Sequence, residues 1–125
     1  MPADYQILET NGSFPGSNPP YLKLFVASQT ANTSPMLMLW VKTAYTTWAN
    51  SASVRINGTE VDRIGPRPWE AGLINIEAIS MPFSSTLLNV LPGYPWLPMI
   101  NQLTIVPATT ADFVYIDNMI LLSRS

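Results

Sequence analysis

The aromatic residues of the proline-rich segments are the best candidates for ligand binding in this sequence. Trp69 has Arg67 and Glu70 close by in the chain, and Tyr94 precedes Trp96 by two residues. Aromatic rings stack on the apolar C–H faces of sugars, while polar neighbours hydrogen-bond the hydroxyls. We therefore expect a carbohydrate site formed by Trp69, Tyr94 and Trp96, with Arg67 and Glu70 as polar contacts.

Other roles remain open for these rings and for Trp48. They could cover the open ends of the fold or stack against prolines, and exposed aromatics also mark protein interfaces. In that case the protein would be a structural or assembly component, such as a homo-oligomer or part of a virion or cell surface. Trp40 differs from them, because it lies in the apolar run Met36–Val41 and is expected in the core.

The sequence contains few of the side chains that commonly act in catalysis. Histidine and cysteine are both absent, which excludes disulfides, thiolate zinc sites, a cysteine nucleophile and a histidine-based triad. A carboxylate pair of the glycosidase type could be formed from Glu70 with Glu77 or Asp62, but no spacing supports either pair. We expect a protein without enzymatic activity.

The composition indicates one domain, residues 1–125, with a polar but weakly charged surface. Charged residues make up 11% of the chain, against about a quarter in typical domains. Such a surface suits extracellular modules, virion components and sugar-binding proteins, although a small β-protein with many polar turns would share it. No secretory signal is visible at the N-terminus.

The charges and apolar runs exclude two classes of partner. The net charge is −2 and the six cationic residues are scattered along the chain, whereas nucleic-acid binding requires clustered Lys or Arg. No apolar run reaches the ~18–20 residues that span a bilayer. We expect no nucleic acid and no membrane-spanning segment.

Short apolar runs separated by Gly, Pro and Asn predict an all-β fold, an antiparallel sandwich of about eight strands. Asn57-Gly58 marks a type I′ hairpin turn within Ser53–Val61. Asn11–Pro20, Arg63–Gly72 and Leu91–Pro98 are expected loops, and Ser84–Val90 is a weak strand or short helical turn. The other expected strands are Tyr5–Glu9, Tyr21–Ser28, Met36–Thr43, Leu73–Met81, Ile100–Val106 and Phe113–Leu122. The expected core contains Leu24, Val26, Leu37, Leu39, Val54, Ile56, Leu103, Ile105, Val114, Ile116 and Ile120.

The last strand carries apolar residues on both sides, and a single acid, Asp117, interrupts it. We expect it to be buried between two layers. Val54-x-Ile56-Asn57-Gly58-x-x-Val61, then Asn101-x-Leu103-x-Ile105, then Val114-x-Ile116-Asp117-Asn118-x-x-Leu121 form an ordered pattern over roughly Leu37 to Leu122. This pattern resembles the galactose-binding-like jelly roll, the fold of many carbohydrate-binding modules.

The resemblance implies a site for a structural calcium ion where the first and last strands meet. Its ligands here would be Asp117 and Glu9, with Asp4 as a further candidate, together with backbone carbonyls. Calcium takes six to eight oxygen ligands, and few are visible. The alternative is that Asp117 lies at a sheet end, or accepts hydrogen bonds from the backbone or from arginine.

Overall fold

The computed structural model describes residues 3–9, 12–15, 21–44, 51–65, 74–107 and 113–124. These residues form nine strands and one short 3-10 helix. The elements are β1 (Ala3–Glu9), β2 (Gly12–Pro15), β3 (Tyr21–Ala27), β4 (Thr33–Ala44), β5 (Ala52–Ile56), β6 (Thr59–Ile64), β7 (Ile74–Pro82), η1 (Ser85–Leu87), β8 (Met99–Pro107) and β9 (Phe113–Arg124).

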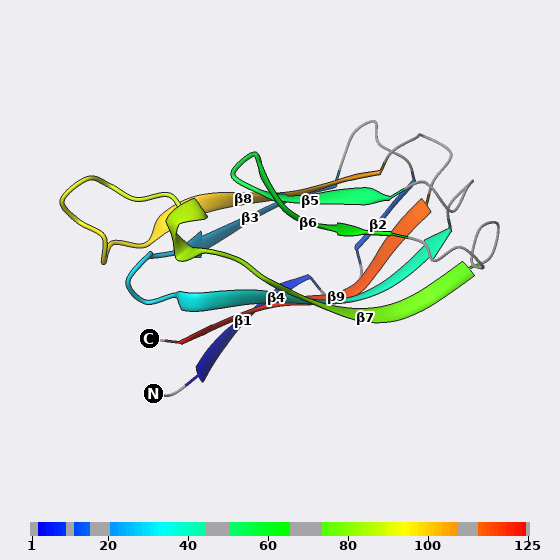
Figure 1. Cartoon of the computed structure of the whole chain (residues 1–125), viewed down its shortest axis with the longest axis horizontal. Coiled ribbons are helices and arrows are strands. Elements are labelled where there is room, and N and C mark those ends of the chain that lie inside the picture. Colours follow the sequence, from blue (N-terminus) through cyan, green and yellow to red (C-terminus); the bar gives the residue numbers. More distant parts are fainter. Residues whose placement is uncertain are drawn as a thin grey trace.

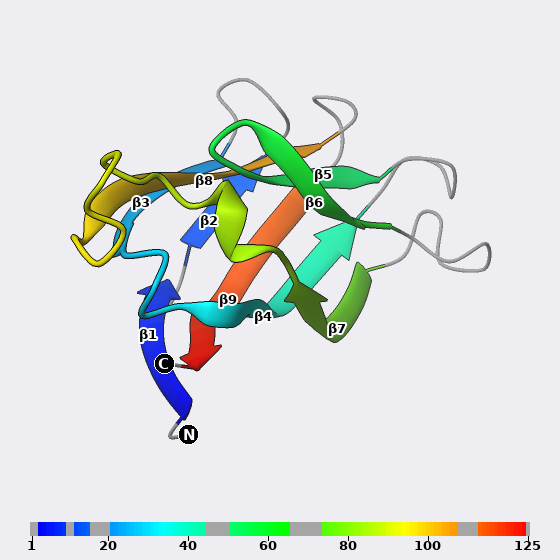
Figure 2. The ribbon, with the colours of Figure 1, turned by 60° about the vertical axis from the view of Figure 1, so that its left-hand side comes forward.

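The strands form two antiparallel sheets that face each other as separate layers (Figures 1 and 2). One sheet has the order β1-β9-β4-β7, with β2 also paired to β9, and the other has the order β3-β8-β5-β6. If β1 and β2 are counted as two parts of one interrupted strand, the chain is an eight-stranded jelly roll with sheets 1-8-3-6 and 2-7-4-5. The predicted fold class is confirmed.

The core lies between the sheets and consists of the inward side chains of both. Leu37, Leu39, Val54, Ile56, Leu103, Ile105 and Ile116 are buried as predicted. The prediction is wrong for β3, where it assigned Leu24 and Val26 to the core. These two residues are exposed, and Phe25 and Ala27 are buried instead. Both faces of β3 carry apolar residues, so its alternation does not reveal which one points inward.

Within the described residues, no third layer covers the outer faces of the central strands β4 and β9. Trp40, expected in the core, is 37% exposed, and Ile120, also expected there, is only half-buried. The expectation that β9 is buried on both sides is therefore wrong. The side chain of Val114 lies outside the described part of the structure.

Asp117 occupies a β-bulge in β9. Trp40 pairs with Asn118 and Val41 with Ile116, so Asp117 has no Cα partner on β4. One extra residue shifts the inward alternation, and Ile116 and Met119 are consequently both buried although they are three positions apart. The acid in this apolar strand thus marks an irregularity in the sheet.

Candidate functional site

The aromatic loop, residues 89–98, contains two consecutive turns that its sequence prescribes. The Tyr94 N–H donates to the Leu91 carbonyl at 2.8 Å, with Pro92 second in the turn and Gly93 third at φ 84°. These are the residues of a type II turn, whose third position requires a positive φ. The Leu97 N–H then donates to the Tyr94 carbonyl at 3.1 Å, with Pro95 second in that turn.

This loop presents two aromatic rings to solvent. The ring centroids of Tyr94 and Trp96 lie 5.5 Å apart, with 70° between the planes, an edge-to-face contact. The two side chains are 50% and 59% exposed. Two prolines and the ring contact limit the conformations of the pair, so little ordering cost remains when a ligand binds.

Three asparagines fasten the base of the aromatic loop. Asn101 is 1% exposed, and its Oδ1 accepts from the Asn89 N–H at 2.7 Å and from Asn57 Nδ2 at 2.9 Å. Its Nδ2 donates to the Met99 carbonyl at 2.9 Å. Asn57 has φ 51° and Gly58 has φ 87°, the predicted type I′ turn, so the hairpin also positions an anchor for the loop.

The turn between β3 and β4 holds the loop from the other side. Gln29 Nε2 donates to the Leu88 carbonyl at 2.9 Å. Thr30 donates through its backbone N–H and its hydroxyl to the Pro95 carbonyl, each at 3.3 Å. The aromatic rings therefore project from a loop that is tied to the sandwich at its base and near its tip.

Trp69, Arg67, Glu70 and Trp48 lie outside the described residues. Ile64, near the start of that segment, pairs with Ala52, which pairs with Pro107 at the end of β8. The aromatic loop joins β8 at its other end, and Figure 1 shows the loop projecting on the side where both chain termini lie. The structure therefore brings Tyr94 and Trp96 together and leaves the contribution of Trp69 a prediction.

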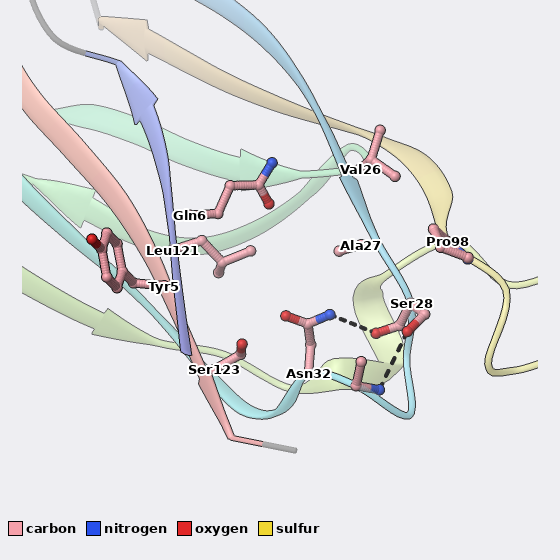
Figure 3. A pocket seen from close by; sticks show the side chains of 10 residues that line it. Tyr5, Gln6, Val26, Ala27, Ser28, Asn32, Pro98, Leu121 and Ser123 are labelled. Atoms are coloured by element: carbon pink, nitrogen blue, oxygen red, sulfur yellow. Dashed lines mark hydrogen bonds between the residues drawn. The ribbon is translucent and has the colours of Figure 1, made fainter. Parts of the chain in front are cut away.

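A second concave site, the edge cleft, lies between the two sheets at the side formed by β1 and β3 (Figure 3). Its volume is about 320 Å³. Its polar lining consists of Gln6, Ser28, Asn32 and Ser123. Its apolar lining includes Val26, Ala27, Pro98 and Leu121. Sequence reasoning missed this cleft, because uncharged residues from distant segments carry no motif; the only signal was a serine in the apolar strand β9.

The predicted calcium site is not tested by the described side chains. Glu9 pairs with Met119, two residues from Asp117, but the Glu9 side chain is outside the described part. Asp4 pairs with Ser123, six residues along β9 from Asp117, which is ~20 Å in a strand. Asp4 is thus too far to share an ion with Asp117. Within the described ranges, no three acidic residues cluster as metal ligands.

An ion pair with hydrogen bonds to serine stabilises the outer face of the β5–β6 hairpin. Glu60 Oε1 accepts from the Ser53 hydroxyl and from Arg63 Nη1, both at 2.6 Å. The hydrogen bond from Ser53, followed by the positive charges of Arg63 and Arg55, lowers the pKa of Glu60 below its ordinary 4.5. This carboxylate stays ionised at neutral pH and is not suited to donate a proton.

Comparison with known proteins supports the fold alone. No protein-family model matches the sequence, and no curated protein matches it. Among solved structures, the chain is similar to dimeric latent PorU from Porphyromonas gingivalis, with a TM-score of 0.58, 11% identity, and coverage of 97% of this chain and 12% of that one. It is also similar to a β-porphyranase of glycoside hydrolase family 86 from the human gut bacterium Bacteroides plebeius, with a TM-score of 0.57, 16% identity, and coverage of 97% and 20%.

Both neighbours are much longer proteins, and the likeness covers a domain-sized part of each. In the described segments, no helix has the length and hydropathy needed to cross a bilayer.

Proposed function

We propose that this protein is a non-catalytic binding module that recognises carbohydrate through its aromatic loop. The observation that carries the proposal is the exposed Tyr94–Trp96 pair, held at 5.5 Å on two consecutive proline turns. Sugar recognition requires aromatic faces that are already in place, because a flexible platform would lose its binding energy to ordering.

The surroundings of the aromatic loop favour a neutral ligand. Residues 24–41 and 78–111 contain no Asp, Glu, Lys or Arg, and they include the loop and both segments that hold it. Neutral amides and hydroxyls remain for polar contacts. The weakly charged surface suits a location outside the cell or on a virion, which forms part of the proposal.

The fold adds support by analogy. The sequence pattern resembles galactose-binding-like jelly rolls, and one structural neighbour is a β-porphyranase by its name. Because one fold carries many functions, this support is weaker than that of the Tyr94–Trp96 pair.

The test is a glycan and polysaccharide array, probed with the wild-type protein in calcium and again in EDTA. We expect a specific neutral glycan to bind, and Trp96→Ala to weaken its binding about tenfold or more, since a ring contact contributes ~1 kcal/mol beyond its buried area. Trp40→Ala, which removes an exposed tryptophan from another face, should leave sugar affinity unchanged. Equal losses of glycan affinity in Trp96→Ala and Trp40→Ala would contradict the proposal, and so would an array on which no glycan binds the wild type.

A second candidate function is assembly, and the outer face of the five-stranded sheet favours it. Tyr5 pairs with Leu122 and Ile7 with Ile120, and Tyr5 and Ile7 are 64% and 58% exposed. The β4 partners of Leu122 and Ile120 are Met36 and Met38, so two apolar rows cross three strands. Contiguous apolar surface of this kind is a mark of interfaces.

In this second candidate function, the binding partner of the sheet face is another copy of the chain. An apolar face can pair with itself across a twofold axis. Sedimentation velocity over a range of protein concentrations tests it. Assembly predicts a mass that rises with concentration and falls to the monomer in Ile7→Glu. A monomer at all concentrations would exclude it, and Trp96→Ala should leave the mass unchanged in either case.

A further inference from the structure

We propose that the edge cleft binds a single neutral sugar unit, next to the aromatic loop. The choice of a sugar rests on the proposed function, whereas the presence of a ligand site rests on the cleft itself. Its volume of about 320 Å³ lies at the lower end of the ~300–1,000 Å³ range of small-molecule pockets.

Ser123 is the observation that points to a ligand. It is 9% exposed and lies on the inward face of β9, where Met119 and Leu121 are the preceding inward residues. Its hydroxyl makes no hydrogen bond to any residue that the structure describes, and Figure 3 shows its oxygen directed into the cleft. A hydroxyl that is directed into an open cleft can pair with a ligand hydroxyl in place of water.

Two amide side chains converge on the same space. Asn32 is 8% exposed, and its Nδ2 donates to the Ser28 carbonyl at 2.7 Å. This hydrogen bond fixes the amide so that Oδ1 points away from Ser28 (Figure 3). Gln6 lies exposed at the mouth, and its amide can both donate and accept.

The remaining walls are apolar and uncharged. Ala27, Pro98 and Leu121 supply aliphatic surface for the C–H face of a ring. None of the described lining residues is charged, so a phosphate, a carboxylate or a metal ion would find no compensating charge. A ring carrying several neutral hydroxyls satisfies both the apolar and the polar lining.

The cleft and the aromatic loop share one turn. Ala31 and Pro98 line the cleft, while Thr30, next to Ala31, donates to the Pro95 carbonyl in the loop. The Ala31 N–H in turn donates to Ser28 Oγ at 3.3 Å. A glycan with one unit in the cleft can therefore extend toward Tyr94 and Trp96.

The experiment is a titration of methyl-labelled protein with neutral mono- and disaccharides, followed by NMR. We expect shifts of the Leu121 and Ala27 methyl signals, and no shifts with glucuronic acid, whose charge the cleft cannot compensate. Ser123→Leu fills the cleft and should remove the shifts, whereas Ser80→Leu, at an exposed position on β7, should keep them.

If Ser123→Leu does not fold, Gln6→Ala at the mouth replaces it, and we expect at least a threefold weaker affinity. Methyl signals that stay unmoved with every neutral sugar would overturn the cleft proposal, and so would shifts that survive Ser123→Leu. The array result with Trp96→Ala is independent. If a glycan binds on the array but causes no methyl shifts, the aromatic loop is the only site. If the methyl signals shift and Trp96→Ala does not weaken binding on the array, the cleft is the only site.

Discussion

At the scale of single residues, the buried amide of Asn101 does more for the candidate site than any charged group. It accepts two hydrogen bonds through Oδ1 and donates through Nδ2, so one side chain joins the hairpin turn, the start of the aromatic loop and β8. A buried amide lowers the stability of the protein unless all of its hydrogen bonds are made. The aromatic loop therefore stays in the one position in which Asn101 keeps these hydrogen bonds.

Replacing Asn101 with alanine should destabilise the protein by ~2–3 kcal/mol, because the Asn89 N–H and the Asn57 amide lose their acceptor. Urea unfolding monitored by circular dichroism measures the change in the free energy of unfolding. Asn118→Ala, at an exposed position, should cost less than ~0.5 kcal/mol. Similar costs for both variants would show that the network is not stabilising.

Glu60 gives the protein a defined response to acid. Its pKa is lower in the folded protein than its ordinary 4.5, so its ionised form contributes stability above that value, and the contribution is lost as the pH falls through the lowered pKa. In Glu60→Gln, the free energy of unfolding should therefore fall less as the pH drops from above 4.5 through the lowered pKa of Glu60. The difference between the variant and the wild type should be small because the Glu60–Arg63 pair is exposed. If the free energy of unfolding of the variant depended on pH as that of the wild type does, the lowered pKa of Glu60 would be contradicted.

Calcium at Asp117 is a residue-scale prediction that the described side chains leave open. If Asp117 and Glu9 hold an ion, the melting temperature should be higher in calcium than in EDTA, since binding to the folded state alone stabilises it. Asp117→Asn should abolish the difference. Identical melting temperatures for the wild type in the two buffers would contradict the prediction.

At the scale of elements, the aromatic loop depends on one backbone conformation at Gly93. A Cβ at this position would touch nothing within 4 Å, but φ is +84°, so an alanine would be strained by its backbone alone. We expect Gly93→Ala to loosen the type II turn and lower glycan affinity severalfold, with a global cost of ~1 kcal/mol. Isothermal titration calorimetry with the array-selected glycan measures the affinity.

Gly65→Ala is the matched control, because its φ is outside the left-handed region and its new Cβ would make only an ordinary 3.7 Å contact with Ser51. It should bind as the wild type does. Equal affinities in Gly93→Ala and the wild type would show that the turn does not position the rings.

Turn residues in the sequence predict local structure better than the alternation of apolar residues predicts which face of a strand is buried. Asn57-Gly58 and Pro92-Gly93 each fix a turn locally, so both positions could be inferred from the sequence. The face of β3 could not, because apolar residues occupy both of its sides and only the partner sheet selects Phe25 over Leu24. Strand β2 was expected to be loop for a similar reason, since its residues become a strand by pairing with β9.

At the scale of the whole molecule, the jelly roll separates two kinds of surface. One end and one edge carry the aromatic loop and the edge cleft, while the outer face of the β1-β9-β4-β7 sheet carries the exposed apolar rows. The aromatic rings could be selected from the sequence because proline and glycine surround them. The cleft could not, because β1, β3, β9, the turn between β3 and β4, and the end of the aromatic loop form it only after folding.

Separate surfaces predict separable effects. Trp96→Ala should reduce sugar affinity without changing the sedimentation coefficient, and Trp40→Ala should leave sugar affinity as it is. A variant that alters both sugar affinity and the sedimentation coefficient would show that the two surfaces are coupled.

The most direct test of carbohydrate recognition is an NMR titration that follows the tryptophan indole N–H signals, of which the chain has four. The array-selected glycan is added stepwise, and Trp96→Ala assigns one signal. We predict a saturable shift of the Trp96 signal while that of Trp40 stays in place. A Trp96 signal that does not move while the glycan is bound would contradict the central claim that the aromatic loop is the site.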